Sequence, residues 1–335
     1  MKKFLKTNRF RENLLNTSYS FYRSRVLHIG FELGIFQLIG RASFSREEIA
    51  KKLKADLRGI AILLNALASL GLLIKRNNRF KNTPEALEVC IPGNEKYVGD
   101  IIKLQNTSWI GWQNLAQTVL EGKPFRRPAF LETDLNATKD FIYAMHNTAM
   151  GHAALLAERV QLRSCKSLVD IGGGSGAFTV YFLKANPKLR GTIFDLPGTL
   201  RVTKDIVSRY GLNDRIAFQE GDFLKDSIKG KYGVAFLSHI IHGLGEADNR
   251  KLVKKIFGVL EEGGKLLIQD FFLNDDHTSP EFAALFALNM LIFTEEGRSY
   301  SLAEAKAWLK EAGFRKVSEI PLHLPRSIRI LRGVK

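Results

Sequence analysis

Residues 168–176 read LVDIGGGSG: an apolar run ends in a carboxylate and passes into three glycines, a serine and a fourth glycine. Glycine permits the left-handed backbone of a tight turn and lets a ligand approach the chain closely. A helical pattern follows, and a helix N-terminus offers free N–H groups to a bound ligand. The stretch therefore predicts a strand, a ligand-binding turn and a helix. Gly172, Gly174 and Ala177 also satisfy the G-x-G-x-x-A pattern of dinucleotide-binding proteins, so the turn alone does not identify its ligand.

Short apolar runs alternate with helical periodicity from residue 167 to the C-terminus. The runs are Ser167–Ile171, Gly191–Leu196, Ile216–Gly221, Tyr232–Ser238, Lys265–Phe272, Val317–Leu322 and Ile328–Leu331. Seven strands separated mostly by helices predict a doubly wound α/β sheet.

The first half of the chain has helical periodicity instead, from Asn13 to about Ala157. The helical segments that we expect are 22–39, one opened by a capping box at Ser45 to Glu48, 56–70, 97–121 and 136–160. A hairpin is expected between Leu72–Ile74 and Phe80–Thr83, which gives the element order of a winged helix. The sequence thus predicts a winged-helix-like domain over 1–95, a helical linker and substrate lid over 96–165, and the α/β domain over 166–335.

The composition is that of an ordinary globular protein, with 45% hydrophobic and 25% charged residues among 335. No stretch approaches the roughly 18 apolar residues of a membrane span, and Met1–Arg11 lacks the apolar core of a signal peptide. Cys90 and Cys165 are too few for a disulfide framework, and no Cys/His cluster has zinc spacing. We therefore expect a cytoplasmic protein with no membrane contact and no metal.

The net charge of +16 permits two interpretations. Residues 1–165 hold 25 Lys and Arg against 14 Asp and Glu, whereas residues 166–335 hold 25 against 20. A nucleic-acid or anionic-membrane partner would explain this excess, as would a lysine-rich proteome, and the scattered arrangement favours the lysine-rich proteome. The helix at 56–70, in the position of a DNA recognition helix, carries Arg58 as its only cation. A winged-helix DNA-binding regulator is therefore the less favoured alternative.

Three acids follow three successive predicted strands. Asp170 precedes the glycines, where it would repel a pyrophosphate but suit a cofactor with an ammonium and a sulfonium group. Asp195 ends the second strand, where a carboxylate accepts hydrogen bonds from ribose hydroxyls. Asp222 and Phe223 follow the third strand, where an acid and an aromatic ring can hold the edge and face of adenine. The acids argue against an NAD-dependent oxidoreductase.

These motifs resemble those of class I S-adenosylmethionine-dependent methyltransferases. Residues 169–178, 194–197 and 221–223 are similar to the O-methyltransferase family that includes plant caffeate and isoflavone enzymes, acetylserotonin O-methyltransferase and bacterial natural-product enzymes. The N-terminal region resembles that family's dimerisation domain, and residues 112–125 resemble its linker. The resemblance implies a Rossmann-like sheet of seven strands, the last one antiparallel, preceded by an all-α winged-helix-like dimerisation domain. It also implies a homodimer that acts on a small-molecule acceptor.

The resemblance implies S-adenosylmethionine as cofactor. Asp195 would bind the ribose and Asp222 with Phe223 the adenine, while Gly172 and Ser238 would lie near the methionine end. The complete set of residues expected to bind the cofactor is Asp170, Gly172, Gly174, Asp195, Leu196, Asp222, Phe223 and Ser238.

A histidine after the fourth strand is the candidate general base. His242 and Asp270, which ends the fifth strand, fall at the same edge of the predicted sheet, where the carboxylate could orient the imidazole. An imidazole pKa near 6.5 suits proton removal. The resemblance places His242 at the family's catalytic base and Asp270 at the usual supporting Glu. His239 lies three residues before His242, but two histidines supply too few ligands for a metal site.

The sequence departs from the family at two points of the catalytic machinery. Gly243 and Leu244 replace the usual Asp-Trp, and Ser299 aligns with a second supporting acid, although Glu295 and Glu296 are near. We expect O-methylation of a small aromatic or polyketide-like hydroxyl, with His242 as base. The departures leave open C-methylation, an acceptor that ionises unaided, or a relative that binds the cofactor without methylating. The residues expected to line the acceptor pocket are Trp112, Phe141, Met145, Asn289 and Met290.

Overall fold

The computed structural model describes residues 2–125 and 134–335, with side chains from residue 7 onward in the first range. The chain forms two compact units, Met1–Thr107 and Ser108–Lys335. The division at residues 95 and 165 that the sequence indicates stays a prediction. Within the described ranges, no helix is long and apolar enough to cross a membrane.

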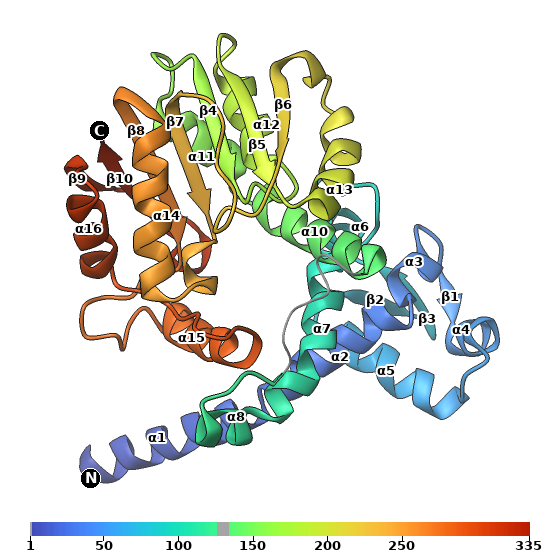
Figure 1. Cartoon of the computed structure of the whole chain (residues 1–335). Helices are drawn as coiled ribbons and strands as arrows, with labels where there is room; N and C mark the ends of the chain where they lie inside the picture. The colour runs from blue at the N-terminus through green and yellow to red at the C-terminus, as the bar shows by residue number, and fades with distance from the viewer. Residues whose placement is uncertain (1, 126–133) are drawn as a thin grey trace. The chain divides into compact units, whose positions relative to one another are not determined.

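The first unit has the predicted winged-helix order (Figure 1). Its sheet has the order β1-β3-β2 with antiparallel pairings, so strands accompany the helices in this unit. Its elements are α1 (Lys2–Tyr19), α2 (Phe21–Glu32), α3 (Ile35–Ile39), β1 (Phe44–Ser45), α4 (Arg46–Leu53), α5 (Leu57–Ser69), β2 (Leu73–Arg76), β3 (Arg79–Asn82) and α6 (Pro84–Val89).

Local sequence signals set several boundaries of this unit. The capping box is present: the Ser45 hydroxyl accepts from Glu48 N–H, and the Glu48 carboxylate accepts from Ser45 N–H at 2.6 Å. Asp56 caps α5 by accepting from Gly59 N–H at 2.7 Å. The single helix expected over 22–39 is wrong, because Gly34 takes a left-handed conformation (φ +65°) between α2 and α3. A left-handed residue cannot continue a right-handed helix.

The helical segment that follows is also more divided than the sequence indicates. In place of one helix over 97–121 the structure has α7 (Gly99–Gln113) and α8 (Leu115–Glu121). In place of one over 136–160 it has α10 (Leu135–Met150) and α11 (Ala153–Val160), separated at Gly151 and His152.

All seven predicted strands form one sheet, with the order β6-β5-β4-β7-β8-β10-β9. The strands from β6 to β8 run parallel, and β10 runs antiparallel to both of its neighbours, as expected. Their bounds are β4 (Ser167–Ile171), β5 (Arg190–Asp195), β6 (Ile216–Glu220), β7 (Tyr232–Ser238), β8 (Leu260–Asp270), β9 (Arg315–Ile320) and β10 (Arg329–Val334).

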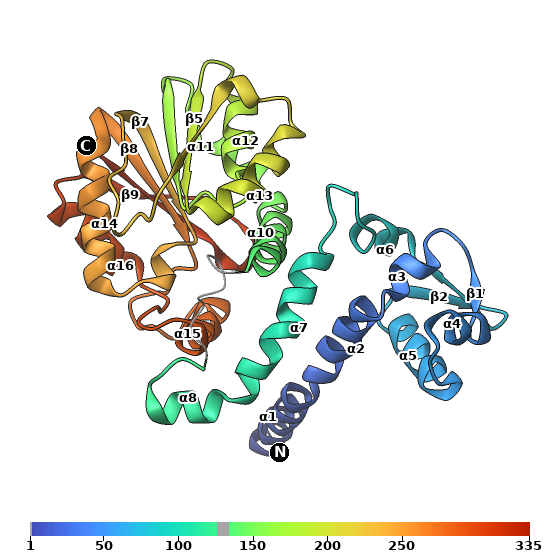
Figure 2. The ribbon, with the colours of Figure 1, turned by 45° about the vertical axis from the view of Figure 1, so that its right-hand side comes forward.

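Helices cover both faces of this sheet (Figures 1 and 2). Val234 and Phe236 of β7 pack into the core beneath α11 and α12, whereas Ala235 and Leu237 pack against α14 and α16. Since alternate residues of a strand point to opposite faces, this strand is apolar throughout. The remaining helices are α12 (Ala177–Ala185), α13 (Pro197–Ser208), α14 (Glu246–Val259), α15 (Glu281–Phe293), α16 (Leu302–Glu311), η1 (Asn213–Arg215), η2 (Ile241–Gly243) and η3 (Pro325–Ser327).

The strand order reverses at β4, which has β5 on one side and β7 on the other. In open α/β sheets, ligands bind outside the carboxyl ends of the strands at such a point. The glycine turn after β4, Asp195 at the end of β5 and Asp270 at the end of β8 all lie along this carboxyl edge.

Candidate active site

The glycine turn after β4 has three left-handed positions, Gly172 (φ +64°), Gly174 (φ +53°) and Gly176 (φ +73°). A Cβ on Gly172 would overlap the Ile240 side chain, and one on Gly176 would lie 2.8 Å from Ile193 Cδ1. A Cβ on Gly174 would meet nothing within 4 Å. Gly172 and Gly176 therefore let the turn pack onto the protein, while Gly174 faces open space that a ligand can fill.

Asp195 joins the end of β5 to this turn. Its Oδ2 accepts from Gly174 N–H at 2.8 Å, and its Oδ1 accepts from Leu196 N–H at 2.8 Å. Burial raises the pKa of Asp195 to about 6. Each carboxylate oxygen can accept a second hydrogen bond, so the side chain can still hold ribose hydroxyls.

Asp170 lies beneath the turn rather than on its open side. It is 1% exposed, and its Oδ2 accepts from the Thr179 hydroxyl at 2.7 Å. Burial, with the nearby charge of Asp195 as a smaller contribution, raises the pKa of Asp170 to about 7. The carboxyl group therefore ties β4 to α12, and its expected contact with a cofactor stays a prediction.

The acid and the aromatic ring after β6 lie beside the turn. Phe223 Cε1 is 3.5 Å from the position of a Cβ on Gly172. Asp222 accepts from Leu224 N–H and from Lys225 Nζ, both at 2.8 Å. Burial raises the pKa of Asp222, but the hydrogen bonds from Lys225 and Leu224 outweigh it and hold the pKa below its usual value. Asp222 is therefore charged near neutral pH.

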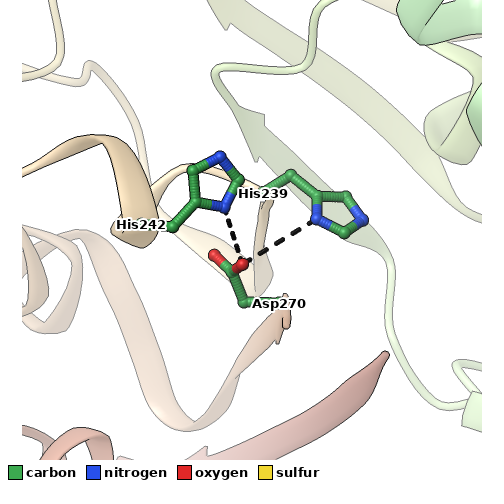
Figure 3. Close-up of side chains that lie close together, drawn as sticks. All are labelled: His239, His242 and Asp270. Atoms are coloured by element: carbon green, nitrogen blue, oxygen red, sulfur yellow. Dashed lines mark hydrogen bonds and ion pairs between the residues drawn. The ribbon is translucent and has the colours of Figure 1, made fainter. Parts of the chain in front are cut away.

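His242 and Asp270 meet at the same edge of the sheet (Figure 3). His242 Nδ1 lies 2.7 Å from Asp270 Oδ1, and Asp270 also accepts from Phe271 N–H at 2.7 Å. Burial raises the pKa of Asp270, but its neighbours His242 and His239 lower it below the ordinary value. A charged carboxylate at Nδ1 fixes the tautomer that carries its proton there, which leaves Nε2 free to accept a proton.

The turn that carries His242 is held by two residues that the sequence did not single out. Asn249, fully buried on α14, donates through its side chain to the Ile241 carbonyl at 2.9 Å. The Tyr300 hydroxyl donates to the Leu244 carbonyl at 2.6 Å. In the sequence, only the presence of Asn249 within an otherwise amphipathic helix could have indicated such a contact. No feature of the sequence marked Tyr300.

Aromatic rings enclose the His242 imidazole. Phe286 of α15 packs edge-on with ring centroids 4.8 Å apart, and Phe271 lies nearly parallel at 6.2 Å. The His242 side chain is 14% exposed. These apolar rings limit the access of water to the base, and neither Phe was predicted to belong to the site.

The residue that aligns with the family's second supporting acid forms a hydrogen bond to α15 instead. The Ser299 hydroxyl donates to the Ala283 carbonyl at 2.7 Å, and Glu295 and Glu296 are exposed. Ser238, which was expected near the cofactor, accepts from Gln269 Nε2 at 3.0 Å. Ser299 therefore supplies no carboxylate to the imidazole, whereas Asp270 contacts it directly.

The structure joins two of the residues expected in the acceptor pocket. Trp112 Nε1 donates to Asn289 Oδ1 at 3.2 Å, and Met290 is buried next to Asn289 on α15. Phe141 instead packs with Val202 and other apolar side chains of α13, and Met145 is half-buried on α10. The pocket lining stays a prediction.

The structure shows a contact between α10 and the glycine turn that was not predicted from the sequence. His146 Nδ1 lies 3.2 Å from the Ser175 hydroxyl, and its Nε2 lies 3.4 Å from the Tyr210 hydroxyl. Burial, with a smaller contribution from Arg209, lowers the pKa of His146 to about 4, so the ring is neutral.

Comparison with known proteins agrees with this geometry. Residues 112–315 match the model of the O-methyltransferase domain, and residues 15–87 match that of the O-methyltransferase dimerisation domain. The chain is 29% identical to 3-hydroxy-5-methyl-1-naphthoate 3-O-methyltransferase of Streptomyces sahachiroi, over 96% of this chain and 94% of that protein. It is 31% identical to the tetracenomycin polyketide synthesis 8-O-methyl transferase TcmO of Streptomyces glaucescens, over 96% of each.

Among solved structures, human N-acetylserotonin methyltransferase in complex with SAM has the same fold, with a TM-score of 0.86 at 24% identity. The alignment covers 97% of each chain. The family predicted from residues 168–176 and the strand-end acids is confirmed. The chain belongs to the O-methyltransferase family and is an S-adenosylmethionine-dependent methyltransferase.

Proposed function

We propose that this enzyme methylates a hydroxyl group of a small aromatic or polyketide-like molecule, with His242 as general base. The observation that carries the proposal is the 2.7 Å contact between His242 and the buried Asp270, at the sheet edge that also holds the glycine turn. Two relatives that match nearly the whole chain are named for O-methylation of a hydroxynaphthoate and of a tetracenomycin polyketide, which supports this acceptor class.

The residues along the sheet edge fit the cofactor. When bound, S-adenosylmethionine supplies an electrophilic methyl group on a sulfonium centre. The open side of the turn at Gly174 leaves room for it, Asp195 retains acceptor capacity for the ribose, and Asp222 with Phe223 can hold the adenine. Leu196, Gly172, Ser238 and Asp170 complete the proposed binding set.

His242 acts on the acceptor. Its Nδ1–H donates to Asp270, so its Nε2 lone pair can take the proton of the acceptor hydroxyl as that oxygen attacks. The ring then becomes an imidazolium, which the charged Asp270 stabilises. Phe271 and Phe286 exclude water around the ring, which strengthens this ion pair.

A screen of hydroxynaphthoates and hydroxylated anthraquinones tests the acceptor class, with the demethylated cofactor product as readout. We expect His242→Ala to abolish most turnover while His323→Ala, which changes an exposed histidine, does not. A product methylated on carbon would favour the C-methyltransferase alternative. Full activity of His242→Ala would contradict the role of His242 as base.

We also propose that the enzyme is a homodimer held by its first unit. This unit exposes large apolar side chains on α1 and α2, among them Phe10 (63% exposed), Leu14 (56%) and Tyr22 (55%). Exposed apolar patches of this kind mark interaction surfaces. Light scattering should give the mass of two chains for the wild type and of one chain for Phe10→Glu with Leu14→Glu. A monomeric wild type would contradict the proposal.

Two further expectations accompany this proposal. A gel shift with duplex DNA at physiological salt should show no specific complex, because α5 presents Arg58 as its only cation. The cytoplasmic location expected from the sequence is tested by cell fractionation.

A further inference from the structure

Three possible metal ligands, one of them the proposed base His242, lie close together (Figure 3). One ring nitrogen of His239, one of His242 and a carboxylate oxygen of Asp270 all lie within 4.8 Å of one another. The His242 contact with Asp270 Oδ1 is 2.7 Å, and that of His239 is 3.9 Å. The three residues come from the end of β7, from η2 and from the end of β8, all within the second unit.

Two buried polar atoms of this cluster lack hydrogen-bond partners. His239 Nδ1 and Asp270 Oδ2 are both inaccessible to solvent and unpaired. Buried polar atoms are nearly always paired, so two such atoms in one cluster need an explanation. A cation bound between the imidazoles and the carboxylate would give His239 Nδ1 a partner and would balance the charge of Asp270.

The backbone keeps the His239 ring directed at the cluster. His239 has φ +56°, which is uncommon for a residue other than glycine, and its N–H donates to the Gln269 carbonyl at 2.9 Å. Strained backbone of this kind is often found at functional sites. The ring also packs against Phe271, with centroids 4.6 Å apart.

The side-chain amide of Gln269 can accept a hydrogen bond from His239 when His239 binds a metal. Gln269 Nε2 lies 3.3 Å from His239 Nε2, and the buried Gln269 Oε1 has no partner. The oxygen and nitrogen of an amide can exchange places by rotation of the group. Gln269 would then accept from His239 Nε2–H, which leaves the Nδ1 lone pair for a metal. A histidine ligand usually donates its second N–H to a carbonyl or carboxylate in this way.

We propose that His239, His242 and Asp270 bind a divalent transition-metal ion of the zinc type, and that this ion inhibits methyl transfer. Imidazole and carboxylate ligands suit zinc, cobalt or copper rather than magnesium or calcium. Bonds of about 2.0–2.1 Å in a tetrahedron place ligand atoms roughly 3.3 Å apart. Small side-chain rotations reach this spacing from the present distances, and the fourth position stays open to water. No metal was predicted from the sequence because only His239 and His242 were considered as ligands and Asp270 was not included.

Inhibition rests on the proposed role of His242 as base. The metal takes the Nδ1 lone pair of His242, so the single proton of the neutral ring moves to Nε2. Nε2 then has no lone pair for the acceptor's proton. Asp270 also exchanges its hydrogen bond with His242 for a bond to the metal.

Cobalt titration of the full-length enzyme tests the site without any activity measurement. We expect the visible absorption bands of tetrahedral Co²⁺ in the wild type, and their displacement by Zn²⁺. His239→Asn should weaken Co²⁺ binding at least tenfold, because Asn tolerates the left-handed backbone but removes the imidazole. His277→Asn is the matched control, since His277 is an exposed histidine with φ +59° outside the cluster. Equal Co²⁺ binding by the wild type and His239→Asn would overturn the site.

Two further measurements make the result decisive. Nitrogen NMR of the wild-type histidines should show Zn²⁺-dependent shifts at Nδ1 of His239 and His242, a readout that needs no variant to fold. The ratio of initial rates with and without Zn²⁺ should fall at least tenfold for the wild type and His277→Asn but not for His239→Asn. Co²⁺ binding at the site without loss of rate would overturn the inhibition and the role of His242 as base, while the metal site itself would stand.

Discussion

Asp270→Asn is the substitution that tests the proposed mechanism most directly. Asn has the size of Asp but no charge, and its amide can donate to His242 Nδ1 where the carboxylate now accepts at 2.7 Å. A donor at Nδ1 favours the tautomer with the ring proton on Nε2. The base would then be protonated on the atom that must receive the acceptor's proton, and its imidazolium would lose its counter-charge.

The 2.7 Å distance between His242 and Asp270 determines the expected loss of activity. Unit charges 2.7 Å apart attract by about 6 kcal/mol at an effective dielectric constant of 20. Since Asp270 is 2% exposed, the cost of removing the pair from water offsets part of this attraction. A net loss of about 3–5 kcal/mol corresponds to a decrease in kcat of roughly 10²- to 10⁴-fold. This range matches the usual contribution of general base catalysis.

The assay compares two forms of the acceptor found in the screen. One keeps its hydroxyl neutral at the assay pH, and the other carries a nitro group ortho to the hydroxyl and is already ionised. Asp270→Asn should lower kcat by the full factor for the neutral form and by less than about tenfold for the ionised one. Asp275→Asn, at an exposed position, is the control. Equal losses for both acceptors would refute proton removal as the function of the pair.

Four other substitutions test the cofactor edge. The folded-state pKa of Asp170 is raised to about 7, so its contribution to stability is present below the unfolded value near 3.8 and is lost as pH rises through 7. Asp170→Asn should therefore stabilise the protein relative to wild type more at pH 8 than at pH 5, with a difference of roughly 3 kcal/mol in unfolding free energy between the two pH values; a pH-independent difference would contradict this. Gly172→Ala should lower the thermal midpoint more than Gly174→Ala, because both strain a left-handed residue but only the first overlaps Ile240; calorimetry should show the reverse order if the turn repacks. Asp195→Ala should weaken S-adenosylmethionine binding at least tenfold by titration calorimetry, and unchanged affinity would remove Asp195 from the site.

Much of the fold follows from local sequence alone. Seven apolar runs form seven strands, and Ser45 begins the helix that its capping box predicts. The helix expected from Asp56 forms, and the glycines after β4 take left-handed conformations. These features depend on a few neighbouring residues, through hydrophobic periodicity, capping hydrogen bonds and the conformational freedom of glycine. Parallel strands share one carboxyl edge, so the sequence could also place His242 near Asp270.

Other features depend on residues far apart in the chain, and only the tertiary structure decided them. The sequence places Asp170 at a strand end, and only the structure shows that its carboxylate accepts a hydrogen bond from Thr179 of α12. Asn249 and Phe286 reach the His242 turn from two different helices, and nothing in the sequence around either residue says which turn it contacts. His239 belongs with Asp270 because the strand end takes a left-handed turn there. Side-chain direction at such points is set by packing across the sheet edge, because long-range contacts outweigh the preferences of neighbouring residues.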